Sequence, residues 1–141
     1  MTTIEGYEFP DDLFFTKDHI WVKAEGNQVT IGLSDFGQGI AGDILFIEMP
    51  NIGRKITKDE AFMSMESGKW VGRVKAPISG TVAEANEELE WETNLVNSDP
   101  YGEGWLAKIT ASDLSELDTL LTASSPELKA LIAEEKAKYN K

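Results

Sequence analysis

The sequence of 141 residues contains no cysteine and only one histidine, His19. Without cysteine the chain has no disulfide, no thiol nucleophile and no thiolate metal site. No serine or cysteine nucleophile motif and no second metal ligand accompany His19, so we expect it to have a structural role or to lie at the edge of a cavity. We therefore predict a chain without catalytic residues or a metal site, in which sulfur for any redox chemistry arrives on a cofactor.

Basic residues are also scarce. The chain has 13 lysines and arginines against 25 acidic residues, which gives a formal net charge of −12. Such a field repels phosphate backbones, so we predict no nucleic-acid binding. The charge would favour a partner with a basic docking face, although solubility alone also accounts for it.

Long apolar runs are missing as well. Apolar residues make up 41% of the chain and charged residues 27%, and no apolar segment has the length needed to cross a membrane. Residues 1–6 resemble neither a secretion signal nor an arginine-rich transit peptide. We predict a cytoplasmic protein with one domain over residues 1–141, and a mature organellar form is the alternative.

Short strands separated by turn residues predict a mainly β core over residues 14–110. Residues 20–24 and 28–33 are predicted to pair as a hairpin. Ser34 is predicted to cap one helical turn that extends to residue 40. The apolar run 44–49 predicts a strand buried on both faces.

The two ends of the chain are predicted to differ from this core. Residues 1–13 form a polar lead-in that we expect to be loosely packed, and residues 111–141 are predicted to form helices. The first begins at Asp113, and the second begins at Ser125 with proline at its first position. Residues 97–100 indicate a tight turn capped by its own side chains. Three tryptophans are predicted to lie in the core: Trp21, Trp91 and Trp105.

A second hairpin places one lysine in a short polar turn. Residues 61–65 and 70–74 have strand composition, and Ser67 with Gly68 indicates a turn, because glycine adopts a positive φ without strain. Lys69 then lies at the hairpin tip, where its ammonium group would be accessible to a modifying enzyme. An ordinary solvated turn lysine is the simpler interpretation, so the surrounding sequence must decide.

That surrounding sequence resembles the glycine cleavage system H protein family. Glu66 lies three positions before Lys69, and Pro77 follows eight positions after it. Similar segments occur in the family's order across residues 14–122. The segments are residues 15–21, 31–34, 42–44 and 95–105.

The resemblance implies a lipoyl/biotinyl-type hammerhead sandwich or flattened barrel with C-terminal helices, in which Lys69 carries lipoate through an amide bond. It implies a non-catalytic carrier that shuttles an aminomethyl group between a decarboxylase, an aminomethyltransferase and a dihydrolipoyl dehydrogenase, and that is loaded by a lipoate-attaching enzyme. Several residues are implied to support the arm: Glu66, Ser67, Gly68, Trp70 and His19.

Three positions differ from the usual family pattern. The family has valine before the lysine and alanine after it, where this chain has Gly68 and Trp70, and Ile20 replaces an acidic residue. These differences leave open a related lipoate-binding carrier that serves redox enzymes of sulfur oxidation. An unmodified adaptor or an enzyme is a third hypothesis, which the absence of a catalytic constellation disfavours. A biotin carrier is disfavoured because no methionine flanks Lys69.

Overall fold

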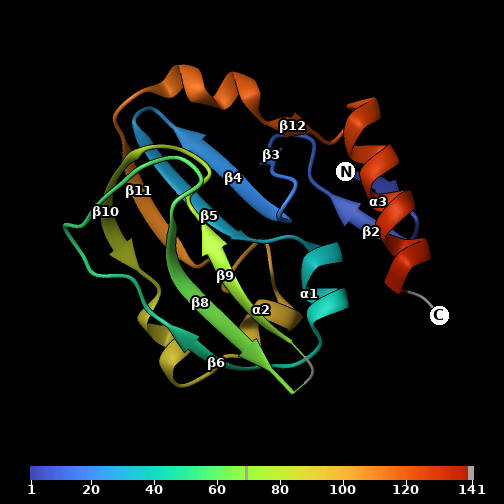
Figure 1. Ribbon diagram of the computed structural model, residues 1–141, viewed down its shortest axis with the longest axis horizontal. Helices are drawn as coiled ribbons and strands as arrows, with labels where there is room; N and C mark the ends of the chain where they lie inside the picture. The colour runs from blue at the N-terminus through green and yellow to red at the C-terminus, as the bar shows by residue number, and fades with distance from the viewer. Residues whose placement is uncertain (69, 140–141) are drawn as a thin grey trace.

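The computed structural model describes residues 1–68 and 70–139, which form two packed β-sheets with a small hairpin and helices around them (Figure 1). One sheet has seven strands in the order β12-β3-β4-β5-β11-β10-β7, and the other has three in the order β6-β8-β9. The strands are β1 (Thr2–Ile4), β2 (Tyr7–Phe9), β3 (Phe14–Phe15), β4 (Ile20–Glu25), β5 (Gln28–Leu33), β6 (Ile44–Glu48), β7 (Lys55–Ile56), β8 (Ala61–Ser67), β9 (Val71–Lys75), β10 (Gly80–Ala85), β11 (Ala107–Ala111) and β12 (Leu121–Thr122). The helices are α1 (Asp35–Ala41), α2 (Leu95–Ser98) and α3 (Pro126–Tyr139), with 3₁₀ turns η1 (Glu87–Glu90) and η2 (Leu114–Thr119).

The mainly β prediction is confirmed, and the sheets form a sandwich instead of a closed barrel. The predicted first hairpin is present, with β4 and β5 antiparallel from the Ile20–Leu33 pair to the Glu25–Gln28 pair. Apolar side chains of both sheets meet between them. Their burial is the main hydrophobic contribution to the stability of the sandwich.

The first 13 residues are folded, so the prediction of a loosely packed lead-in was wrong. β1 and β2 form an antiparallel hairpin. Its side chains Ile4 and Phe9 are buried, as is Leu13, in a second apolar cluster that includes Phe36 of α1 and Ile132 of α3. These apolar residues are spaced among polar ones, which conceals their common face in the sequence.

β6 is buried on one side only, which corrects the prediction for residues 44–49. Ile44 and Ile47 are buried, whereas Leu45 and Phe46 are exposed. The pairing register between β6 and β8 shifts between Ile44 and Phe46, and this irregularity breaks the alternation along the strand. Trp91 is also wrongly predicted, because it is 82% exposed beside η1, whereas Trp21 is buried and Trp105 packs partly buried.

The C-terminal segment contains one α-helix. The predicted first helix is the 3₁₀ turn η2, in which the Asp113 carboxylate accepts a hydrogen bond from the Ser115 amide. The second helix begins at Pro126 as predicted, and it lies beside the N-terminal hairpin (Figure 1). Leu128 and Ile132 of this helix are buried in the same apolar cluster as Ile4 and Phe9. None of the helices in the described part of the chain has the length and apolar character needed to span a bilayer. The single domain and the cytoplasmic location stay predictions.

Candidate functional site

The lysine hairpin predicted from the sequence is formed by β8 and β9. The strands are antiparallel, and Glu66 pairs with Val71 at the last step before the turn. The Ser67 amide then donates a 2.7 Å hydrogen bond to the Trp70 carbonyl oxygen, which holds together the two ends of the connection. Lys69, the predicted attachment residue, lies outside the described residues. Its chain neighbours therefore define the site.

The end of this hairpin is fastened to α1. The Ser67 hydroxyl donates a 2.6 Å hydrogen bond to the carbonyl oxygen of Ala41, the last residue of α1. Ser34 caps the other end of α1, as predicted, by accepting a bond from the Gly37 amide. Gly42 ends the helix with φ of 79°, a conformation that favours glycine. A hydrogen-bonded helix end thus supports the turn that contains Lys69.

Asn97 hydrogen-bonds to the segment that follows α1, and it was not predicted from the sequence as a site residue. Its amide oxygen accepts a bond from the Ile44 amide, and its nitrogen donates to the Gly42 carbonyl oxygen and the Gln38 side chain. Residues 97–100 were predicted to form a turn in which Asn or Asp caps its own backbone. Asp99 confirms this, because its carboxylate accepts a hydrogen bond from the Glu103 amide, whereas Asn97 instead bridges α2 to the α1–β6 connection. No pattern near Asn97 indicates these partners, which lie more than 50 positions away.

A shallow hollow of about 490 Å³ lies beside the hairpin turn. The residues that line it come from the α1–β6 connection, from β6, and from the end of β8 with the residue after it: Gly42, Asp43, Leu45, Ser67 and Gly68. Gly68 is exposed, and space is open where its Cβ would lie. Its φ is outside the positive range that we predicted for it. The described residues beside the turn therefore leave a hollow and an open position at Gly68.

The other predicted supporting residues beside Lys69 are exposed. The Glu66 side chain is on the surface between Phe46 and Val71, with which it pairs across the strands. Trp70 is 36% exposed. The immediate surroundings of the turn are therefore accessible, apolar in part and negatively charged at Glu66.

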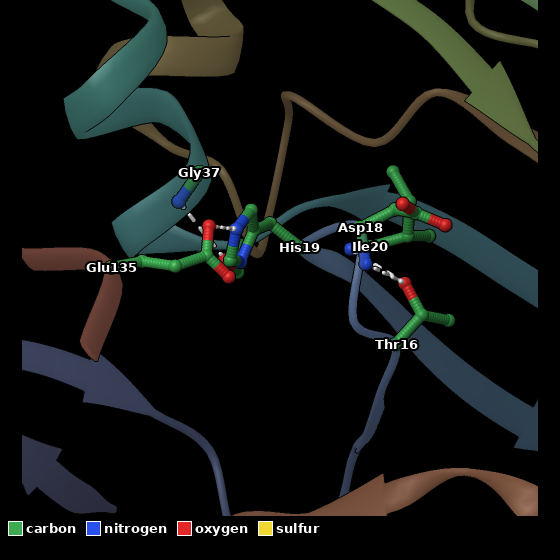
Figure 2. Close-up of polar contacts among 7 residues, drawn as sticks. Thr16, Asp18, His19, Ile20, Gly37 and Glu135 are labelled. Carbon is green, nitrogen blue, oxygen red and sulfur yellow. Dashed lines mark hydrogen bonds and ion pairs between the residues drawn. The ribbon is translucent and has the colours of Figure 1, made fainter. Parts of the chain in front are cut away.

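His19 lies in a different environment. It has φ of 69°, and its Nε2 lies 2.8 Å from Oε1 of Glu135 in α3 (Figure 2). Its ring packs edge-on against Phe36, with ring centroids 5.1 Å apart. The described contacts of its side chain thus place His19 between α1 and α3.

Tyr101 is a partly buried titratable group that hydrogen-bonds to the first residue of α1. Burial raises the pKa of its phenol well above the ordinary value, and the nearby carboxylates of Asp35 and Glu8 act in the same direction, against a bond from the Asp35 amide. Its hydroxyl also donates to the Glu8 carbonyl oxygen, so it joins α1 to the N-terminal hairpin. Among residues 1–68 and 70–139, no group of three histidine or acidic side chains is arranged to hold a metal ion.

Comparison with known proteins agrees with this geometry. The model of the family described as glycine cleavage H-protein matches residues 13–134. The glycine cleavage system H protein of Staphylococcus haemolyticus is 46% identical over 125 residues, which cover 89% of this chain and 98% of that protein. The H protein of Geobacillus kaustophilus is 47% identical over 118 residues, or 84% and 93% of the two chains.

A solved structure has the same fold. The crystal structure of a glycine cleavage system H protein from Mycobacterium marinum superposes with a TM-score of 0.75 at 29% identity, and covers 91% of this chain and 98% of the other. Sequence and structure therefore agree along almost the full length of both chains. The chain belongs to the glycine cleavage H-protein family, whose members carry lipoate covalently on a lysine.

Proposed function

We propose that Lys69 is the lipoyl attachment residue of this chain, and that the chain is a non-catalytic carrier subunit of a glycine cleavage system. The observation that carries the proposal is the hydrogen bond between the end of the hairpin and α1. The Ser67 hydroxyl donates this bond to the last residue of α1, while Gly68 and Trp70 are exposed. A carrier needs this combination, because the turn must be reachable by several enzymes while its position on the protein stays fixed.

Lipoate, once attached, would supply two sulfur atoms, one to hold the aminomethyl cargo and both to change between the disulfide and dithiol states. A chain without cysteine has no sulfur nucleophile of its own that would compete for this chemistry. The protein contributes the tether: linking the arm to a folded domain raises the concentration of the cargo at each partner's active site.

We propose the partners that the family implies, namely a decarboxylase, an aminomethyltransferase and a dihydrolipoyl dehydrogenase, together with a lipoate-attaching enzyme. The similar proteins named above are glycine cleavage system H proteins, which favours this assignment over a carrier for sulfur oxidation. The chain belongs to the family even though Gly68, Trp70 and Ile20 differ from its usual pattern. Supporting roles for Glu66, Ser67, Gly68 and Trp70 belong to the same proposal.

The experiment is lipoylation of the purified chain by a lipoate-attaching enzyme with lipoate and ATP, followed by intact mass spectrometry. The chain should gain one lipoyl group, and Lys69→Arg should gain none. Lys75→Arg, at the other end of β9, is the matched control and should be modified like the natural chain. Modification that persists in Lys69→Arg would contradict the assignment.

A further inference from the structure

The indole ring of Trp70 lies directly against Gly72. A Cβ atom built on Gly72 would overlap Cζ2 and Cη2 of Trp70. The ring therefore occupies the space that a side chain at position 72 would fill. Trp70 directly precedes β9, the strand that leaves the lysine turn, and Gly72 lies two positions later, inside that strand.

The close approach explains why position 72 is glycine. Gly72 does not have a positive φ, so the conformation of its backbone does not call for glycine. The ring is the nearest neighbour that a Cβ there would meet. The absence of a side chain at Gly72 therefore allows the indole ring of Trp70 to pack directly on the backbone there.

The seated ring is also partly open to solvent. Trp70 is 36% exposed, and its carbonyl oxygen is held by the Ser67 amide. Its backbone is therefore fixed at the turn, and packing on Gly72 orients the ring. An oriented, half-exposed indole immediately follows residue 69 in the chain.

We propose that Trp70 is a positioning residue, and that its exposed indole surface is a platform on which the oxidised lipoyl arm of Lys69 packs when no partner holds it. This inference rests on the proposed function, because it requires an arm on Lys69. Trp70 is also a position at which this chain differs from the usual family pattern.

The chemistry of the two groups supports the packing. The arm is a saturated chain that ends in a five-membered ring with two sulfur atoms, and it is apolar. Sulfur atoms make favourable contacts with aromatic rings, and covering apolar surface on both groups adds to this. A seated ring also loses little side-chain entropy when the arm packs on it, because it is already ordered.

The test uses the lipoylated full-length chain, with modification verified by intact mass. Tryptophan emission is compared with the arm oxidised and after reduction by a phosphine, because a disulfide quenches an indole that it touches. We expect emission to rise on reduction, and the rise to disappear in Trp70→Phe. Trp91→Phe is the matched control, since Trp91 is 82% exposed beside η1, and it should retain the rise.

The rate of arm reduction gives a second readout. Removing the platform in Trp70→Ala should accelerate reduction by phosphine about fivefold, which corresponds to about 1 kcal/mol of lost packing. Gly72→Ala, which unseats the ring but retains the indole, should produce part of this acceleration.

The outcomes separate this inference from the proposed function. An unmodified Lys69 would overturn the proposed function and the platform with it, and mass spectrometry alone would show it. A lipoylated chain whose emission change and reduction rate are the same in Trp70→Phe and Trp70→Ala would overturn the platform only. Weaker binding of a partner enzyme to those variants, with both arm readouts unchanged, would assign the ring to the partner and contradict the inference.

Discussion

The Ser67 hydroxyl donates a 2.6 Å hydrogen bond to the carbonyl oxygen of Ala41, and this bond joins the β8–β9 hairpin to the last residue of α1. The two residues are 26 positions apart in the sequence. The bond connects the turn that contains Lys69 to the end of α1, and Asn97 hydrogen-bonds to α1 and to the connection that follows it. The position of the turn therefore depends on a short chain of hydrogen bonds as well as on strand pairing.

Replacing Ser67 with alanine should loosen the turn without unfolding the protein. Loss of the hydroxyl leaves the Ala41 carbonyl oxygen without this partner and should cost about 1 kcal/mol of stability. Urea denaturation measures the cost, and amide exchange across residues 66–71 should accelerate. Ser112→Ala, at an exposed position after β11, is the control. Unchanged exchange in the hairpin would show that the bond does not hold the turn.

Asn97→Ala should destabilise the protein more strongly. The substitution removes one acceptor and two donor contacts that are partly buried, and the free energy of unfolding should fall by about 2–3 kcal/mol. Asn97→Asp keeps the acceptor for the Ile44 amide but places a carboxylate against the Gly42 carbonyl oxygen, so it should not restore stability. The control is Asn51→Ala on the surface, and an equal effect of the two alanine variants in chemical denaturation would refute the bridging role.

Shortening Ile132 should test how firmly α3 is docked. The side chain is completely buried against the N-terminal hairpin, so Ile132→Ala should lower the free energy of unfolding by about 2–4 kcal/mol. Leu131→Ala, at a partly buried neighbouring position, should cost less. Thermal and urea unfolding measure both variants, and equal losses would mean that α3 does not pack as described.

Tyr101 should make stability fall at high pH. Its pKa is raised by burial in the folded chain, whereas the unfolded chain releases the proton near pH 10. Above about pH 10 the folded state therefore binds more protons than the unfolded state, and stability declines as pH rises. Tyr101→Phe should be less stable at pH 8, because two hydrogen bonds are lost, but it should lack this part of the decline. If the free energy of unfolding changed with pH in the same way for the natural chain and for Tyr101→Phe from pH 8 to pH 11, the predicted contribution of Tyr101 would be contradicted.

Local patterns predicted the parts of the fold that depend on local chemistry. Strand composition in residues 20–24 and 28–33, on both sides of turn residues, predicted the first hairpin. Ser34 was correctly predicted to cap α1, and Pro126 to begin α3. The hairpin that contains Lys69 was also predicted, because turn and strand composition adjoin there. Each of these features is determined within a few residues.

The errors arose where distant contacts decide the outcome. The apolar run at residues 44–49 gave no indication of the register shift that exposes Leu45 and Phe46. The polar residues among 1–13 concealed a hairpin whose buried face is completed by α3. Asn97 resembled a self-capping turn residue, although its partners lie on α1 and β6. Burial and hydrogen bonding across such separations leave no local pattern.

The most direct test of the central claim is intact mass spectrometry of the chain purified from its native host, with peptide mapping across Lys69 before and after reduction. The account predicts one lipoyl group on the peptide that contains Lys69, and a gain of two hydrogens when that group is reduced. An unmodified Lys69 in cells that contain ample lipoate would contradict the carrier function.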